Sequence, residues 1–103
     1  MREAVASALE MAAGSQRSDL TSNTMLAMAL ARCLEVLGEA ASKVTPEVRL
    51  RFSGIPFAKM VSMRNRLIHA YFDIDLDIVW TTVTADLPSV LPVLDAVLAE
   101  IDV

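Results

Sequence analysis

The chain is poor in several residue types that usually shape a fold or carry chemistry. Its 103 residues include one cysteine, one histidine and three glycines. The single cysteine, Cys33, cannot form an internal disulfide, which excludes a disulfide-stapled fold and indicates a reducing, cytoplasmic compartment. One histidine with scattered acids does not make a zinc ligand set, and Asp73, Asp75 and Asp77 alternate without the rest of a calcium loop. We therefore expect no metal and no cofactor.

Long uncharged runs are also missing. The longest stretch without a charge, Leu20 to Ala31, has 12 residues and contains polar side chains. A membrane-spanning helix needs about 20 apolar residues, so we expect no transmembrane segment. The N-terminus carries Glu3 at once and lacks the apolar core of a signal peptide.

Apolar residues are abundant for so short a chain. They make up 54% of the sequence, and the mean hydropathy is +0.47. A chain of this length forms one domain, residues 1–103, with a modest interior, so part of the apolar surface is expected to be covered by another chain. Ala, Leu and Met dominate, which favours helix.

Charge is distributed unevenly along the chain, whose net charge is −4. Residues 43–66 carry six bases against one acid, whereas residues 67–103 carry seven acids and no Lys or Arg. An acidic protein is a poor general binder of nucleic acid, because that affinity depends on neutralising phosphates. The basic segment could still form a local phosphate site; an ordinary solvated surface of uneven sign explains the same pattern.

Apolar residues recur at helical spacing through most of the chain and predict an all-α antiparallel bundle of about four to five helices. The predicted helices cover residues 2–13, 20–43, a short segment from Thr45-Pro46 to near Gly54, Ile55-Pro56 to about His69, and Leu76 to about Asp102. Ser18 or Asp19 should cap the second of these helices, and Asp75 the last. Residues 71–74 read as a non-helical turn, and Pro88 and Pro92 should kink or interrupt the last helix.

The long second helix has more apolar residues than one core face needs. Met25, Met28, Cys33 and Val36 widen its stripe. This surplus predicts an oligomer surface; burial between several helices would also account for it.

The segment from Met63 to Tyr71 gathers the residues best suited to chemistry. Arg64 precedes the only histidine, His69, by five residues, and Tyr71 follows by two. Histidine moves protons near neutral pH, and arginine steadies charge on a phosphoryl group, so the pair could cleave a phosphodiester without metal. On a regular helix Asn65, not Arg64, shares the face of His69 and could set its tautomer. Arg64 must reach around, or the helix must unwind near its end.

Cleavage of RNA by its own 2′-hydroxyl needs a base and an acid, and one chain supplies one histidine. The acid must be His69 of a second copy in a two-fold dimer, Tyr71, or water. Taken alone, an Arg-x4-His string is more often structural: the histidine caps a helix end, and Arg64 and Arg66 are surface charges.

The wider sequence resembles the HepT-like branch of the HEPN superfamily, small helical proteins of prokaryotic toxin–antitoxin and defence systems. The matching stretches lie between about residues 20 and 100; they are Leu37-Gly38-Glu39-Ala40-Ala41, Ile55-Pro56, Met63-Arg64-Asn65-Arg66-Leu67-Ile68-His69-Ala70-Tyr71-Phe72-Asp73-Ile74-Asp75, Ile78-Val79-Trp80 and Asp86-Leu87-Pro88. The Arg-x4-His-x-Tyr string in its context is fairly specific to that family.

The resemblance implies a dimer whose Arg–His motifs face a shared cleft. It implies a metal-independent endoribonuclease toxin of a type VII toxin–antitoxin system, with Arg64 and His69 as catalytic residues. It also implies a cognate minimal nucleotidyltransferase, similar to MntA, that acts as antitoxin by adding AMP to Tyr71. Asn65 and Tyr71 would support the site. Arg66 and Lys59 are candidates for contacts with RNA phosphate, and Glu39 could pair with Arg64 or Arg66 or be structural.

A different function stays open beside the ribonuclease. The chain could be a non-catalytic helical subunit that binds a nucleotide or recruits substrate for a nucleotidyltransferase. The overall acidity and the shortage of acid–base groups favour that alternative.

Overall fold

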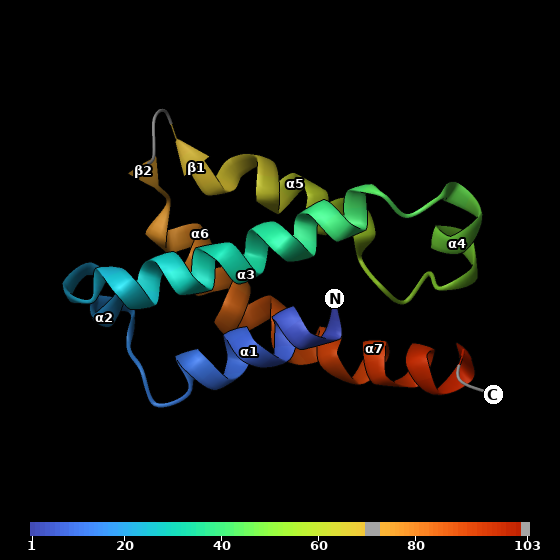
Figure 1. Ribbon diagram of the computed structural model, residues 1–103, viewed down its shortest axis with the longest axis horizontal. Coiled ribbons are helices and arrows are strands. Elements are labelled where there is room, and N and C mark those ends of the chain that lie inside the picture. Colours follow the sequence, from blue (N-terminus) through green and yellow to red (C-terminus); the bar gives the residue numbers. More distant parts are fainter. Residues whose placement is uncertain (70–72, 102–103) are drawn as a thin grey trace.

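The structure, a computed structural model, describes residues 1–69 and 73–101, and within them the fold is a bundle of helices with one very short hairpin (Figure 1). The elements in chain order are α1 (Arg2–Ala12), α2 (Arg17–Ser22), α3 (Thr24–Ser42), α4 (Pro46–Arg51), α5 (Phe57–Leu67), β1 (Ile68–His69), β2 (Asp73–Ile74), α6 (Leu76–Thr81), the π-helical segment η1 (Thr82–Asp86) and α7 (Leu87–Ile101). The all-α prediction is confirmed.

Helix α3 lies in the middle of the molecule and organises the rest. It packs against α5 on one side and α1 on the other, while α1 also packs against α7 (Figure 1). The hairpin and α2 lie near one end of α3, and α4 lies beyond its other end. The described molecule measures 44 × 29 × 17 Å along its principal axes.

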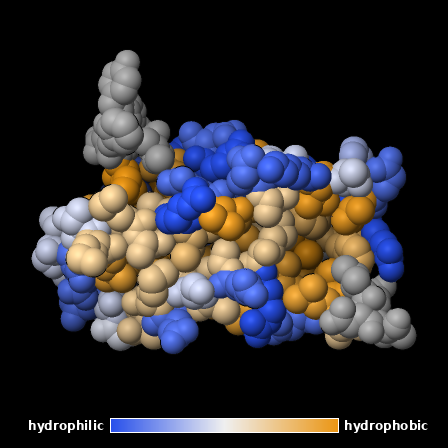
Figure 2. Space-filling model, in the orientation of Figure 1, coloured by the Kyte–Doolittle hydropathy of each residue, from blue (hydrophilic) through white to orange (hydrophobic). Residues whose placement is uncertain are grey.

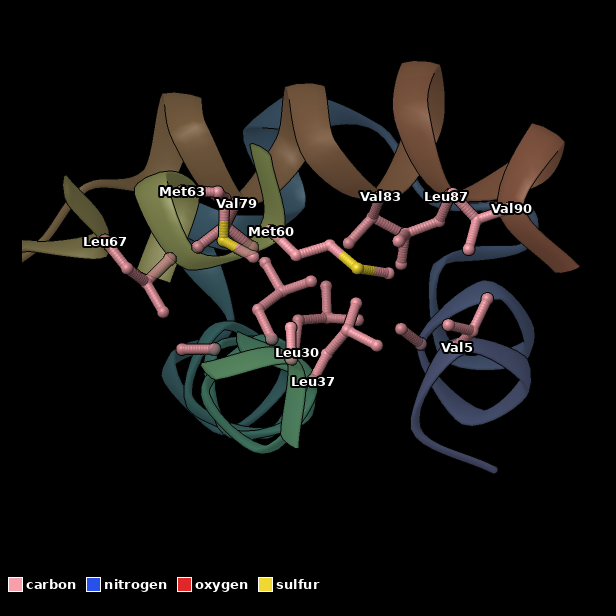
Figure 3. Packing of buried hydrophobic residues seen from close by; sticks show 14 of the residues in the cluster. Val5, Leu30, Leu37, Met60, Met63, Leu67, Val79, Val83, Leu87 and Val90 are labelled. Carbon is pink, nitrogen blue, oxygen red and sulfur yellow. The ribbon is translucent and has the colours of Figure 1, made fainter. Parts of the chain in front are cut away.

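The core forms where the apolar stripes of four helices meet (Figure 3). Leu30, Leu34 and Leu37 of α3 are at most 1% exposed, and Leu67 at the end of α5 is fully buried. The other helices contribute Val5 from α1 and a line of residues from the last helix: Val79, Val83, Leu87, Val90 and Leu94. The predicted helical period is therefore the one that builds the core.

Three helix starts follow from side-chain caps. Thr45 accepts a hydrogen bond from the backbone N–H of Val48, with Pro46 at the first helical position, and Asp75 accepts from the N–H groups of Asp77 and Ile78. Both starts agree with the sequence prediction. The third cap is Asn23, which accepts from the N–H of Leu26 and begins α3.

The prediction of one uninterrupted helix over residues 20–43 is wrong. Residues Arg17–Ser22 form a separate α2, and Asn23 interrupts the helix with an extended backbone. Asn disfavours helix interiors because its side chain competes for nearby backbone groups, and here that competition produces a cap. Asp19 does not cap α3 as expected; it completes the capping box of α2 with Gln16.

The last helix runs from Leu76 to Ile101, close to the predicted bounds, but it changes its hydrogen-bonding pattern on the way. In η1 the N–H of Leu87 bonds to the carbonyl of Thr82, five residues back, just before Pro88. The predicted disturbance by proline thus takes the form of a π-helical turn ahead of Pro88, and Pro92 lies inside α7.

One helix of the described part, Leu76–Ala99, passes the length and composition criteria for a membrane span. A core helix of a globular bundle passes the same criteria. This one supplies five buried residues to the core and packs against α1, and 28% of its 18-residue apolar window is buried.

Candidate functional site

Arg64 lies where α3 and α5 approach most closely. Gly38 of α3 is buried beneath it, and a Cβ atom at position 38 would be 2.4 Å from the Cβ of Arg64. Non-bonded carbon atoms do not approach so closely, so the absence of a side chain at Gly38 is what admits the stem of Arg64. The backbone of α3 therefore fixes where the Arg64 side chain leaves α5.

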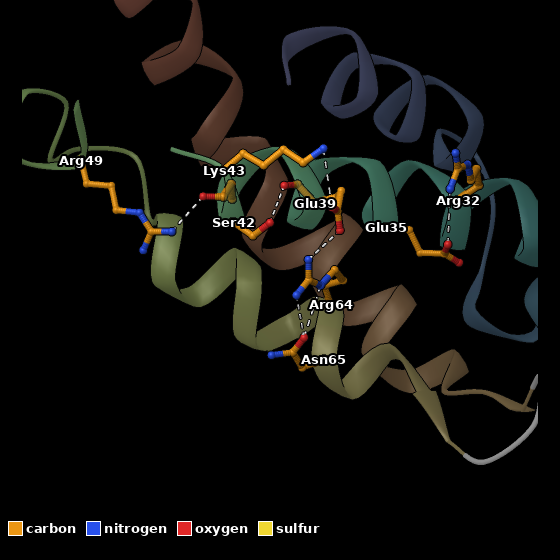
Figure 4. A network of polar contacts seen from close by, with 9 residues as sticks. Arg32, Glu35, Glu39, Ser42, Lys43, Arg49, Arg64 and Asn65 are labelled. Carbon is orange, nitrogen blue, oxygen red and sulfur yellow. Dashed lines mark hydrogen bonds and ion pairs between the residues drawn. The ribbon is translucent and has the colours of Figure 1, made fainter. Parts of the chain in front are cut away.

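The guanidinium of Arg64 is held from two sides (Figure 4). Its Nη1 donates to Oε2 of Glu39 at 2.9 Å, while Nη2 and Nε donate to Oδ1 of Asn65 at 3.0 and 3.3 Å. The Arg64 side chain is 26% exposed, so part of it still faces solvent. Of the two partners expected for Glu39, the structure selects Arg64.

Glu39 also faces a second cation. Nζ of Lys43, one helical turn further along α3, lies 3.8 Å from Oε1 of Glu39 (Figure 4). The carboxylate therefore lies between Arg64 and Lys43, and this cluster of three charges keeps a net positive charge. A positive cluster with an exposed edge suits an anion such as a phosphate.

Arg64 lies in the last turn of α5, and His69 lies just beyond the end of that helix. The helix stops at Leu67, and Ile68–His69 continue as the extended strand β1. The sequence left open whether Arg64 reaches around the helix or the helix unwinds near its end, and the structure shows the helix unwound before His69. The helix ends two residues earlier than predicted: Ile68 and His69 instead pair with β2, and the carbonyl of Leu67 accepts the N–H of Asp75 at 2.8 Å.

The hairpin places the backbone of His69 opposite that of Asp73, with Ile68 opposite Ile74. His69 and Asp73 are described in their backbone only. Tyr71 and Phe72, the first two residues of the expected turn, lie outside the described residues. The predicted hydrogen bond between Asn65 and the imidazole therefore stays a prediction; the structure shows Oδ1 of Asn65 engaged by Arg64, which leaves its amide N–H groups as donors.

Lys59 and Arg66 lie on a different face of α5 from Arg64. Both line a groove between α5 and the last helix, together with Asp86 and Thr82. Nζ of Lys59 is 3.4 Å from Oδ1 of Asp86, and Nε of Arg66 donates to the carbonyl of Ser62 in its own helix at 3.4 Å. The three cations do not converge on one point, so contacts of Lys59 and Arg66 with RNA would be separate from the Arg64 cluster.

The outer side of α3 is apolar and open. Met25 is 82% exposed, Met28 58% and Val36 41%, and Cys33 beside them is partly buried. Figure 2 shows hydrophobic surface along the course of α3 across the middle of this view. Met25, Met28 and Val36 are not buried between helices within the described chain, whereas the partly buried Cys33 packs against the core. Burial does raise the pKa of the Cys33 thiol.

Within the described residues, no group of three or more His, Cys, Asp or Glu side chains is placed to hold a metal ion. The carboxylate of the cluster, that of Glu39, is paired with Lys43 and Arg64. The described part of the site therefore offers cations rather than metal ligands.

The importance of Gly38 was missed from the sequence, and the role of Glu39 was left undecided. Both depend on which residue of α5 crosses α3, a contact between positions 26 residues apart. The Leu37–Ala41 stretch marked the region without revealing that contact.

Comparison with known proteins identifies a family for the chain. The family profile described as "Ribonuclease HepT-like" matches residues 1–97. The chain is 33% identical over 84 residues to "Putative RNase MJ1216" of Methanocaldococcus jannaschii, covering 82% of this chain and 69% of that protein. It is 41% identical over 61 residues to "Probable ribonuclease HepT" of Thermococcus cleftensis, covering 59% of this chain and 56% of that protein. No solved structure matches the chain at a significant level.

Proposed function

The chain belongs to the HepT-like ribonuclease family, which supports ribonuclease activity, and from that premise we propose that it is a metal-independent endoribonuclease. The observation that carries the proposal is the cluster around Arg64. An arginine is fixed by Glu39 and Asn65 with part of its side chain exposed, five residues before the only histidine of the chain.

In the proposed reaction His69 removes the proton from a ribose 2′-hydroxyl, and the resulting oxygen attacks the adjacent phosphorus. The bond from phosphorus to the 5′-oxygen of the next nucleotide breaks, and that oxygen takes up a proton. Arg64 stabilises the extra negative charge on the phosphoryl oxygens during the attack. The products are a 2′,3′-cyclic phosphate and a free 5′-hydroxyl.

The reaction also needs a proton donor for the leaving oxygen, and we propose that a second copy of the chain supplies it. A two-fold homodimer would bring a second His69 to the same cleft. The exposed apolar face of Met25, Met28 and Val36 gives the dimer surface to bury, and α3 carries both this face and Glu39. Tyr71 or water is the donor if the protein acts as a monomer.

We further propose that the protein is the toxin of a type VII toxin–antitoxin system. A cognate minimal nucleotidyltransferase similar to MntA would neutralise it by adding AMP to Tyr71. Tyr71 lies two residues from His69 in the sequence, so an adenylate there would bring negative charge to the region that binds RNA phosphate. Replacement of Tyr71 by Phe should prevent the modification and leave the dimer intact; a modified Tyr71→Phe protein would exclude Tyr71 as the acceptor.

The test of the proposed function is incubation of purified protein with mixed RNA in EDTA, with His69→Ala as the comparison. We expect cleavage that survives chelation, leaves 2′,3′-cyclic phosphate ends and is lost in His69→Ala, whose circular dichroism should be unchanged. Mass spectrometry must first show that Tyr71 carries no AMP. Equal cleavage by both proteins would show a contaminating nuclease, and no cleavage by the unmodified wild type would favour the non-catalytic subunit.

A further inference from the structure

Glu39 occupies an unusual position for a residue beside a phosphate site, because a carboxylate repels the anion that the site is built to bind. It nevertheless makes the shortest contact of the Arg64 guanidinium, 2.9 Å from Nη1. Three explanations are possible: the ion pair only stabilises the α3–α5 packing, it blocks the arginine until RNA displaces it, or it aims the arginine.

The packing explanation is weakened by Gly38. The approach of α3 to α5 is already fixed by the contact between Gly38 and the stem of Arg64, and by buried residues such as Leu37 and Met63 below it. The Glu39 side chain is 58% exposed and lies outside this packed region, where an ion pair adds little to stability.

The blocking explanation is weakened by the geometry of the guanidinium. In the contacts that the structure shows, Nη1 of Arg64 donates once, to Glu39, and Nη2 and Nε each donate once, to Asn65. An arginine has five N–H donors, so one N–H on each terminal nitrogen remains for a phosphate oxygen without release of Glu39. Lys43, 3.8 Å from the other oxygen of Glu39, offsets the negative charge that the carboxylate would present to RNA.

We propose that Glu39 is a positioning residue for the nuclease reaction, acting through Arg64. With Asn65 on the opposite side, it fixes the plane of the guanidinium so that its two remaining terminal N–H groups are presented together to a phosphoryl group. A freely rotating arginine would have to be ordered in each transition state, at a cost in entropy. Glu39 removes that cost because it holds the guanidinium in place before the reaction. The inference rests on the proposed ribonuclease function.

The experiment compares Glu39→Ala and Glu39→Gln with the wild type and with Glu35→Gln. Glu35 is a matched control: it lies one turn away on α3 and pairs with Arg32, at 3.5 Å, instead of Arg64. Cleavage of a fluorogenic RNA is measured in EDTA. We expect kcat to fall about tenfold or more in Glu39→Ala, with little change in KM, and to fall less in Glu39→Gln, which keeps an acceptor oxygen. Glu35→Gln should behave as the wild type.

A double-mutant cycle with Arg64 separates positioning from a direct or purely structural role. If Glu39 acts through Arg64, then Glu39→Ala should cause no further loss of kcat in an Arg64→Ala protein. An equal loss in both backgrounds would overturn the proposal. Faster cleavage by the Glu39 variants would overturn it in favour of blocking, and unchanged cleavage would leave only a surface ion pair.

A measurement independent of cleavage distinguishes failure of this inference from failure of the proposed function. The mobility of the Arg64 side chain can be followed by NMR relaxation of its Nε–H group, assigned with Arg64→Lys. We expect a rigid signal in the wild type and in Glu35→Gln, and a mobile one in Glu39→Ala. A wild type that does not cleave RNA would refute the proposed nuclease function. A mobile Arg64 side chain in a wild type that does cleave RNA would refute the role proposed for Glu39.

Discussion

The two faces of α5 carry similar charges and use them differently. On the face toward α3, Arg64 contacts Gly38 with its stem and Glu39 and Asn65 with its guanidinium. On the face toward the last helix, the contact of Arg66 within the described residues is a long hydrogen bond to the carbonyl of Ser62 in its own helix, at 3.4 Å. Two arginines separated by one residue thus differ in how firmly they are oriented, and orientation is what a catalytic cation requires.

Removing each arginine in turn tests most directly whether the difference in their orientation matters for cleavage. We expect Arg64→Ala to lower kcat/KM for RNA by at least about 100-fold, the loss typical when a preorganised charge donor is removed. Arg66→Ala should lower it far less and mainly through KM, because Arg66 would contact phosphate at the periphery. Both rates are measured in EDTA on protein free of AMP. Equal losses would mean that the fixed orientation of Arg64 has no importance for the reaction.

The close approach beneath Arg64 can be disturbed without touching a charge. Gly38→Ala places a methyl group 2.4 Å from the Cβ of Arg64, so the helices must shift. We expect a loss of about 1–3 kcal/mol in the free energy of unfolding, the usual range for overpacking, and a slower nuclease. Urea denaturation measures the first effect.

Gly54→Ala is the matched control for that substitution. Its new Cβ would be 3.4 Å from Cγ1 of Val93, and the residue is exposed. Stability should change by only about 0.5 kcal/mol, as for most surface substitutions. A Gly38→Ala protein as stable as Gly54→Ala would show that α3 and α5 can separate freely at this point.

The ion pair on the other face of α5 should matter least to the reaction. The side chains of Lys59 and Asp86 are 67% and 37% exposed, so Asp86→Asn should lower the unfolding free energy by no more than about 1 kcal/mol. Thermal unfolding at low and high salt checks this, because salt should weaken the wild type more than the variant. Cleavage should stay near the wild-type rate, in contrast to Glu39→Gln; a comparable loss would erase the difference between the faces.

Cys33 lies on α3, away from both faces of α5, and is expected to have a small effect on the pH dependence of stability. Burial raises the pKa of its thiol above the ordinary 9.0, so the folded chain holds this proton more tightly than the unfolded chain. The resulting stabilisation is complete below the ordinary pKa and is lost as the pH rises through the raised one. Iodoacetamide should alkylate Cys33 more slowly in the folded protein than in urea at pH 8; equal rates would contradict the raised pKa.

Local signals in the sequence predicted much of this fold. Thr45 with Pro46, and Asp75, marked helix starts that the structure confirms, because a cap is made within three residues of the chain. The break at Asn23 was missed because the apolar period continues across it. The π-helical turn before Pro88 was anticipated only as a disturbance, since proline excludes one hydrogen bond without dictating its replacement.

The site was predictable in its residues and not in its contacts. The string from Arg64 to Tyr71 was visible in the sequence, which left open whether Arg64 reaches around the helix or the helix unwinds before His69. The pairing of Arg64 with Glu39, and the dependence of both on Gly38, arise from the crossing of two helices far apart in sequence. No periodicity within either helix reports which residues meet at that crossing.

The crossing of α3 and α5 also bears on how such a chain can change over generations. One of the two residues that meet there must lack a side chain, and Arg64 cannot be the one if its guanidinium performs the reaction. The residue without a side chain must therefore be the one on α3, because α5 has to keep the side chain of Arg64. A descendant that lost the nuclease and replaced Arg64 with Gly would be free to acquire alanine at position 38. The two positions should be inherited as a pair, and Gly38 would then mark an active copy without taking part in the reaction.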